Sequence, residues 1–210
     1  MEITWLGHSC FRIKGNKTTI VTDPYAPEGS ETPLKLTADI VTVSHPDAGH
    51  SYVQAVSGKP HLIQGPGEYE ISGVLILGIP TFQDSVGGVE RGKNTVYLME
   101  IDEVSILHCG DLGHMLNAAA IEEIGNVDVL MVPVGDKTTI GATTAAELVR
   151  RLEPKIIIPM HYPVKAFDTD LEPVDKFLKE VGGKEITPQP KLTVTKPRMP
   201  LTTQVVLLDI

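Results

Sequence analysis

Two short, almost continuous apolar runs with a helix pattern between them constrain the fold of this chain most strongly. The runs cover residues 127–134 (VDVLMVPV) and 155–159 (KIIIP). Apolar runs of this length are typical of strands that are covered on both faces. Between them, residues 141–152 carry apolar side chains at helical spacing, and Pro154 ends the pattern. The second half of the chain is therefore predicted to alternate strand and helix.

The first half of the chain consists of short β-branched runs separated by turn residues. We expect strands at residues 3–6, 10–14, 18–22, 39–44, 68–71, 74–79, 94–101 and 104–108. Short helices are expected at 117–124 and 173–181, and closing strands at 192–195 and 203–208. This order suits two packed sheets with helices outside them. We predict an α/β fold, a four-layer αββα sandwich, forming a single domain over residues 1–210.

Composition narrows the range of functions. The formal net charge is -9, which disfavours a nucleic-acid partner, because a phosphate backbone requires a positive protein surface. Only two cysteines occur, Cys10 and Cys109, which is typical of a reduced compartment rather than of a disulfide scaffold. The sequence shows no signal peptide, and no apolar run approaches the roughly 20 residues of a membrane helix. We therefore expect a cytoplasmic protein with no membrane partner.

Imidazole and carboxylate side chains directly follow three of the expected buried strands. They are His45, Asp47, His50, Asp111 and His161. Rigid strands in α/β folds point such residues at one edge, and the loops let them converge. Mixed nitrogen and oxygen ligands suit zinc, iron or manganese. A single histidine at a strand end is more often a hydrogen-bonded structural residue, but the five together favour a metal site.

Seven segments along the chain carry a resemblance to a known family. They are ITWLGHSCF, TDPY, SHPDAGH, PGEYEISGV, ERGKNTVYLMEI, HCGDLGH and IIIPMHY. In this order they resemble the small metal-dependent hydrolases of the metallo-β-lactamase superfamily, near the L-ascorbate-6-phosphate lactonase branch. The resemblance extends over the whole chain and implies the metallo-β-lactamase fold.

The ligand motif of that family, H-x-H-x-D-H, is only half matched. The chain reads HPDAGH, in which His45 and His50 match the outer histidines. Asp47 replaces the middle histidine, and Gly49 replaces the aspartate with a residue that has no side chain to donate. In the family that aspartate binds one metal and helps to orient the attacking water. Its loss should weaken hydrolysis.

The remaining family ligands are matched in two of three places. Asp111 in GDLGH matches the bridging aspartate and His161 in PMHY matches the last histidine, whereas Gln83 stands where a further histidine is usual. The resemblance therefore implies one divalent metal rather than two, with zinc first and manganese or iron as alternatives. Its expected ligands are His50, Asp111 and His161, with help from His45 or Asp47.

Two functions remain open at this point. The first is a metal-dependent hydrolase of a small ester, lactone or phosphoester, with Asp111 and His50 as candidate catalytic residues. The second is a catalytically inactive homologue that serves as a binding or structural protein. A superfamily nuclease is disfavoured by the acidic charge and by the lack of an additional domain to hold RNA or DNA.

Other residues in or near the motifs are expected to bind substrate or to support the structure. Arg91, Asn94 and His114 are candidates for binding an anionic small-molecule substrate, although a solvated turn or a structural role at a helix start would also explain them. Asp23 in TDPY is expected either to organise a loop or to support the first motif without binding the metal itself. Cys109 lacks a base partner and is expected to pack rather than to react. A homo-oligomer is an expectation from the resemblance alone.

Overall fold

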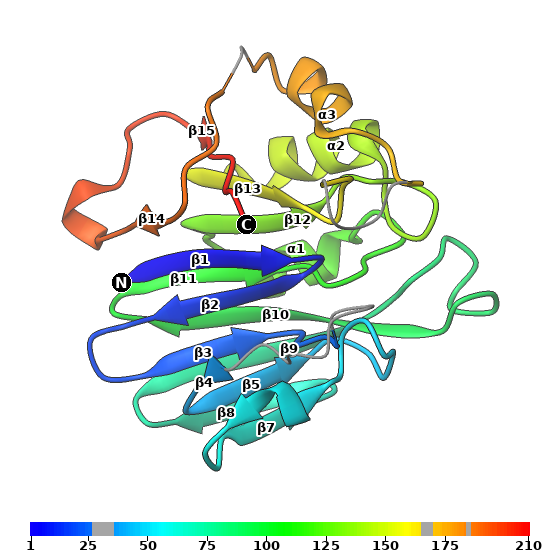
Figure 1. Ribbon diagram of the computed structural model, residues 1–210. Helices are drawn as coiled ribbons and strands as arrows, with labels where there is room; N and C mark the ends of the chain where they lie inside the picture. The colour runs from blue at the N-terminus through cyan, green and yellow to red at the C-terminus, as the bar shows by residue number, and fades with distance from the viewer. Residues whose placement is uncertain (27–35, 165–169, 184–185) are drawn as a thin grey trace.

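Two β-sheets packed face to face form the centre of the structure (Figure 1). The computed structural model describes residues 1–26, 36–164, 170–183 and 186–210. Side chains from Ile3 to Leu208 join one buried apolar cluster between and around the sheets. None of the helices in these ranges is long and apolar enough to cross a membrane.

The first sheet contains the N-terminal strands. Its order is β14 (Leu192–Thr193), β1 (Glu2–Gly7), β2 (Cys10–Lys14), β3 (Thr19–Thr22), β5 (Ile40–Val43) and β7 (His61–Gln64). Alternate side chains face opposite sides of a strand. Ile20 and Ile40 therefore join the core between the sheets, while Val21 and Val41 join a smaller outer cluster.

The second sheet contains the strands that the apolar runs predict. Its order is β15 (Gln204–Val205), β13 (Ile156–Met160), β12 (Val129–Pro133), β11 (Val104–His108), β10 (Lys93–Ile101), β9 (Val74–Phe82) and β8 (Gly67–Ile71). β11, β12, β13 and β15 are parallel. Every residue of β12 and β13 is buried, which explains their continuous apolar sequence.

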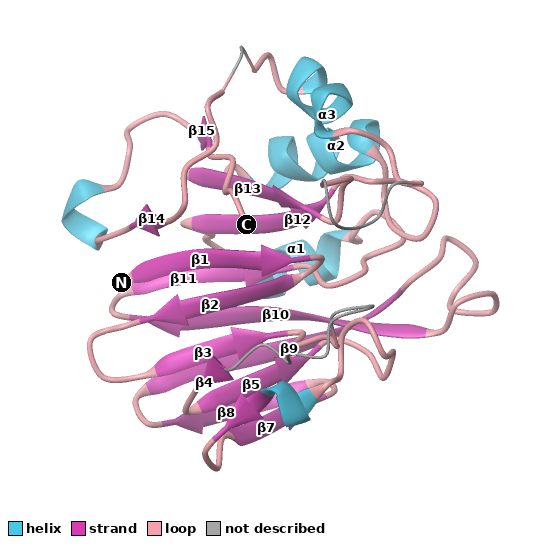
Figure 2. Ribbon diagram, in the orientation of Figure 1, coloured by secondary structure: helices cyan, strands magenta, loops and turns pink. Residues whose placement is uncertain are grey.

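Outer layers cover both sheets (Figure 2). Helices α1 (Ala118–Ile124), α2 (Ala142–Leu152) and α3 (Val174–Glu180) lie outside the second sheet. The turn η1 (Val53–Ala55) and the paired strands β4 (Leu36–Thr37) and β6 (Val56–Ser57) lie over the first. A second short turn, η2 (Lys196–Arg198), lies near the C-terminus. The predicted αββα sandwich is confirmed, with a thin outer layer over the first sheet in the described ranges.

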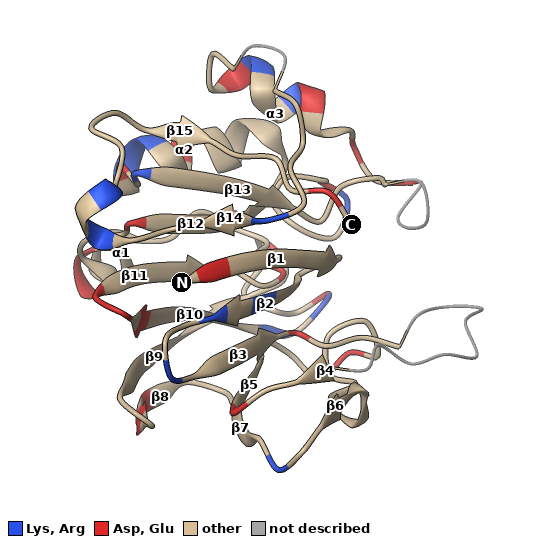
Figure 3. Ribbon diagram, turned by 60° about the vertical axis from the view of Figure 1, so that its left-hand side comes forward, with Lys and Arg blue, Asp and Glu red and all other residues tan. Residues whose placement is uncertain are grey.

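Charged residues lie largely at turns, near strand ends and in the helices (Figure 3). Two ion pairs join distant parts of the chain: Lys191 with Glu2 on β1, and Lys196 with Asp128, each at 2.7 Å. Because such pairs are exposed or only partly buried, each contributes little stability on its own. The apolar core and the buried polar groups described below therefore hold the sheets together.

A buried tyrosine links the two sheets close to the edge that carries the histidines. Tyr97 on β10 is fully buried, its hydroxyl donates to the carbonyl of Val43 at 3.0 Å, and the Gly65 N–H donates to it at 2.9 Å. We predict that Tyr97→Phe lowers the free energy of unfolding by about 1–3 kcal/mol, because it leaves a buried donor and acceptor unpaired. Urea denaturation checks this, and an unchanged midpoint would contradict it.

Candidate metal centre

Three loops meet at one edge of the sandwich, where the carboxyl ends of β5, β11 and β13 lie (Figure 1). His45 and His50 follow β5, Asp111 follows β11, and His161 follows β13. All four side chains are buried. The structure thus brings together residues that are more than a hundred positions apart in the sequence, as the strand-end pattern predicts.

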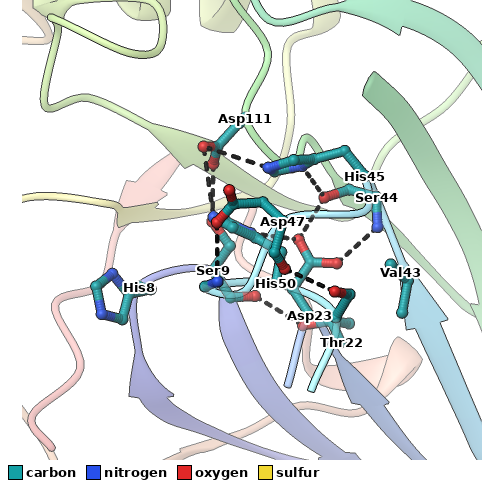
Figure 4. A network of polar contacts seen from close by, with 12 residues as sticks. His8, Ser9, Thr22, Asp23, Val43, Ser44, His45, Asp47, His50 and Asp111 are labelled. Carbon is teal, nitrogen blue, oxygen red and sulfur yellow. Dashed lines mark hydrogen bonds and ion pairs between the residues drawn. The ribbon is translucent and has the colours of Figure 1, made fainter. Parts of the chain in front are cut away.

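Asp111 lies at the centre of this group (Figure 4). Its Oδ2 is 3.4 Å from His50 Nε2 and 3.9 Å from His45 Nε2, and its Oδ1 is 3.6 Å from His161 Nε2. Ligand atoms of His45, His50 and Asp111 all lie within 4.8 Å of one another. Two ligands of one tetrahedral zinc ion are about 3.4 Å apart, given bonds of about 2.0–2.2 Å. His45, His50 and Asp111 therefore fit one divalent ion, while His161 contacts the other oxygen of the Asp111 carboxylate and lies outside this close group of three.

The tautomer of His45 follows from a short chain of hydrogen bonds. The Ser44 hydroxyl donates to Asp23 Oδ2 at 2.6 Å, and the Ser44 Oγ lies 3.0 Å from His45 Nδ1. Because the hydroxyl hydrogen points to Asp23, Oγ can only accept from Nδ1–H. His45 therefore directs an unprotonated Nε2 toward Asp111, which is the form that binds a metal.

The same buried carboxylate orients His50. Asp23 Oδ2 lies 3.1 Å from His50 Nδ1, and Asp23 Oδ1 also accepts the Ser44 N–H at 2.7 Å. A carboxylate behind a histidine fixes its ring and makes Nε2 a stronger ligand. Asp23 thus orients the rings of both histidines of the first motif, directly for His50 and through Ser44 for His45, which is the supporting role expected of it. Ser44, which joins Asp23 to His45, was not singled out from the sequence.

His161 is held through its backbone instead. Its N–H donates to the carbonyl of His8 at 3.3 Å, and both residues have positive φ, 55° and 47°. Such backbone conformations are uncommon outside glycine and cluster at functional sites. Its buried Nδ1 has no hydrogen-bond partner in the part of the chain that the structure describes. Ser9 completes the surroundings of the carboxylate, its hydroxyl donating to Asp111 Oδ1 at 3.4 Å.

Electrostatics at the site favour a cation. Burial lowers the pKa of His50, but the carboxylates of Asp111 and Asp23 outweigh it and raise that pKa to about 9. His45 behaves differently, because burial and the neighbouring His50 lower its pKa. Burial raises the pKa of Asp111, yet the three histidines outweigh it, so the net pKa is lowered. The pKa of Asp23 is lowered as well, so two ionised carboxylates favour positive charge at His50, which lies against both.

Two residues from the degenerate motif lie outside this donor set. The Asp47 carboxylate is exposed, and its Oδ1 accepts the N–H of Gly49 at 2.8 Å, so it caps its own loop. Gln83 donates its side-chain N–H to the carbonyl of Lys93 at 2.8 Å. The structure therefore brings His45, rather than Asp47, to the group formed by His50, Asp111 and His161.

The substrate-binding candidates are placed differently from one another. Asn94 is 2% exposed, and its amide bonds to Thr81, Cys109 and Asp111. The Nε2 of His114 accepts the Phe82 N–H at 3.1 Å, and its Nδ1 donates to the Met115 carbonyl at 2.9 Å. Both ring nitrogens thus serve the main chain. Arg91 is exposed on the loop between β9 and β10, and its role stays a prediction.

The similarity of the chain to known proteins shows its family. A family model described as the β-lactamase superfamily domain matches residues 2–161. The chain belongs to the metallo-β-lactamase superfamily. The superfamily and the fold inferred from the sequence motifs are thereby confirmed, and the candidate ligands at the strand ends lie within or at the end of the matched region.

Several members of the superfamily are similar over nearly their full length. A protein of Thermococcus kodakarensis named a metal-dependent hydrolase is 27% identical over 212 residues, covering 88% of this chain and 93% of that protein. One of Methanoculleus marisnigri with the same name is 30% identical over 189 residues, 77% of this chain and 81% of that protein.

Solved structures of the superfamily agree with the fold. A candidate zinc-dependent hydrolase of the metallo-β-lactamase superfamily from Thermotoga maritima superposes with a TM-score of 0.82 at 40% identity, covering 99% of this chain and 97% of that one. A metallo hydrolase of Ignicoccus hospitalis, with a TM-score of 0.70 at 20% identity over 92% of this chain and 99% of that one, supports the fold alone.

Replacing the buried acid behind the histidines tests the geometry. We predict that Asp23→Asn weakens zinc binding by about 10- to 100-fold, because residues that orient metal-bound histidines have effects of this size. Competition with a chromophoric chelator measures the change. Asp175→Asn, an exposed site on α3, is the matched control and should leave the affinity unchanged. Equal affinities for all three proteins would contradict the assigned role.

The loop that carries Arg91 is organised by one carboxylate. Asp84 Oδ1 accepts the N–H groups of Val86 and Gly88, and Oδ2 accepts those of Glu90 and Arg91, at 2.7–3.1 Å. Burial raises the pKa of Asp84, but these four donors outweigh it and lower the pKa to about 2. The ionised Asp84 therefore stabilises the conformation of the loop between β9 and β10.

This lowered pKa predicts a pH dependence. The contribution of Asp84 to stability is fully present above its ordinary pKa of 3.8 and is lost as the pH falls toward about 2. We predict that Asp84→Asn is less stable than the native chain at neutral pH, and that the difference in Tm shrinks between these two values. A Tm difference that stays constant over this range would contradict the prediction.

Proposed function

We propose that this chain is a metal-dependent hydrolase of a small ester, lactone or phosphoester, working with one divalent ion. The observation that carries the proposal is the convergence of three imidazole Nε2 atoms, from His45, His50 and His161, on the Asp111 carboxylate within 3.4–3.9 Å. The names of the similar proteins, metal-dependent and zinc-dependent hydrolases, support the same reaction class.

Each residue has a defined task in this proposal. His45, His50, Asp111 and His161 hold the ion, while Ser44 and Asp23 contact Nδ1 of His45 and His50, respectively, and so turn Nε2 of both rings toward it. A bound divalent ion supplies Lewis-acid polarisation and lowers the pKa of water. Three nitrogens and one carboxylate suit zinc, with manganese or iron as alternatives. Arg91, exposed on the rigid loop organised by Asp84, is proposed to attract an anionic group of the substrate.

A second candidate function is a non-catalytic relative that uses the site only for binding. Gly49 favours it, because this position provides no carboxylate to orient water, and Asp47 caps its own loop instead of replacing it. The two functions differ in one observable: both allow a metal to bind, but only the first predicts turnover.

Hydrolysis assays separate the two. The protein is loaded with zinc, manganese or iron in turn and tested on p-nitrophenyl esters, simple lactones and bis-p-nitrophenyl phosphate. We predict turnover of at least one class, abolished by a chelator and by Asp111→Ala. Glu122→Ala, an exposed change on α1, should retain the rate. A metal-loaded protein with no turnover of any class would favour the binding function.

The departure from the family motif predicts the number of metals. At Gly49 a Cβ would meet only Asp47 Oδ1, at 3.3 Å, so the chain has room for a side chain there. We predict that the combined variant Asp47→His, Gly49→Asp, Gln83→His binds one more ion per chain than the native protein. Elemental analysis measures this, and an unchanged metal content would show that the motif departures do not limit the number of ions.

A further inference from the structure

β10 extends past the end of its partner strand at the site. The two strands are antiparallel with Tyr97 opposite His108, and continuing that register by three residues places Asn94 opposite Asp111. β11 ends at His108, so the backbone ladder stops before this point. Asn94 on β10 therefore lies opposite Asp111, but the backbone of Asp111 is not part of a strand that could pair with β10.

The side chain of Asn94 replaces the missing ladder bonds. Its Oδ1 accepts the N–H of Asp111 at 3.1 Å, and its Nδ2 donates to the carbonyl of Cys109 at 3.0 Å. One amide therefore bridges the two backbone groups on either side of Gly110, as a paired strand would. A further Nδ2 bond, to Thr81 Oγ1 at 2.8 Å, fixes the amide on β9. Every hydrogen-bonding group of Asn94 has a partner.

Gly110, which lies between those backbone groups, leaves room for Ser44 to pack close to Asn94. Gly110 has φ 54°, and a Cβ there would lie 2.6 Å from Asn94 Oδ1 and 2.5 Å from Ser44 Cβ. Next to Asn94, the N–H of Thr95 donates to the carbonyl of Ser44 at 2.9 Å. Ser44 precedes His45, and Gly110 precedes Asp111. Ser44 and Gly110, the residues just before two proposed ligands, are therefore closely packed against each other and against Asn94 on β10.

We propose that Asn94 is a positioning residue for the metal ligand Asp111, fixing the carboxylate relative to His45 across the two sheets. The inference rests on the proposed metal-binding function. It replaces the expectation that Asn94 touches substrate. Asn94 and Asp23 act on different groups: Asp23 orients the imidazoles, and Asn94 orients the backbone that carries the carboxylate.

Zinc affinity of the full chain tests this inference. The protein is stripped of metal, and the Kd for zinc is measured by chelator competition. We expect Asn94→Ala to weaken binding by about 10- to 100-fold, the range found for groups that orient ligands. Thr81→Val is the matched control: it removes an Asn94 contact on β9 but leaves both bonds to the Asp111 turn. It should change the Kd by no more than about twofold, even if it lowers Tm.

Two further measurements separate positioning from general support of the fold. The absorption spectrum of the cobalt-loaded protein should change in Asn94→Ala and not in Thr81→Val, because it reports the arrangement of the ligands. In the metal-stripped protein, the Asp111 amide should exchange its hydrogen faster in Asn94→Ala alone. If Asn94→Ala does not fold, Asn94→Ser is used, since its hydroxyl is too short to bridge both backbone groups.

The outcomes are distinct. Native protein that binds zinc, with an Asn94→Ala Kd within twofold of it and an unchanged cobalt spectrum, would overturn the positioning role while leaving the proposed function standing. Native protein that binds no zinc, manganese or iron would overturn the proposed function, and the positioning role toward a metal with it. Equal losses of zinc affinity in Asn94→Ala and Thr81→Val would assign Asn94 to general support and overturn the inference.

Discussion

The site depends on one buried negative charge, the carboxylate of Asp23. A buried ionised acid is unfavourable unless hydrogen bonds and opposite charge compensate it. Asp23 is fully buried and accepts from the Ser44 N–H, the Ser44 hydroxyl and His50. Those partners are the residues that flank or form the first histidine motif. Satisfying Asp23 therefore fixes the loop after β5 and, with it, the ring orientations of His45 and His50.

The second requirement is that the two sheets remain in register with each other. His45 and His50 come from the first sheet, whereas Asp111 and His161 come from the second. Buried polar contacts at the shared edge join them: Tyr97 to Val43 and Thr95 to Ser44. A small shift between the sheets would separate Asp111 from the imidazoles. The metal centre is thus a property of the packed sandwich rather than of one loop.

Much of this could be predicted from the sequence because burial leaves a clear pattern. The apolar runs of β12 and β13 and the amphipathic α2 were located from periodicity, and the histidines and Asp111 from their place after strands. β7 was missed, since in HLIQ only Ile63 is buried and no alternation stands out. Asp47 and Asn94 show the other limit. The sequence does not show that the Asp47 carboxylate bonds to its own loop, or that the Asn94 amide bonds to the turn at Asp111. The three-dimensional arrangement of the chain decides both orientations.

The structure shows what the residues at the unmatched motif positions do instead. Gly49 has no side chain to donate, Asp47 accepts a hydrogen bond from its own loop, and Gln83 donates to Lys93. The positions that remain are those with buried support from Asp23, Ser44, Ser9 and Asn94. The superfamily fold is retained along with His45, His50, Asp111 and His161 of its ligand motifs, which is why the reaction has to be argued from the remaining residues.

The metal content of the native protein tests this account most directly. The chain is purified without chelator and analysed for zinc, manganese and iron, beside Asp111→Ala and His161→Ala. The account predicts about one divalent ion per native chain and a loss of that ion in both variants. Two tightly bound ions per chain, or none after incubation with each metal, would contradict it.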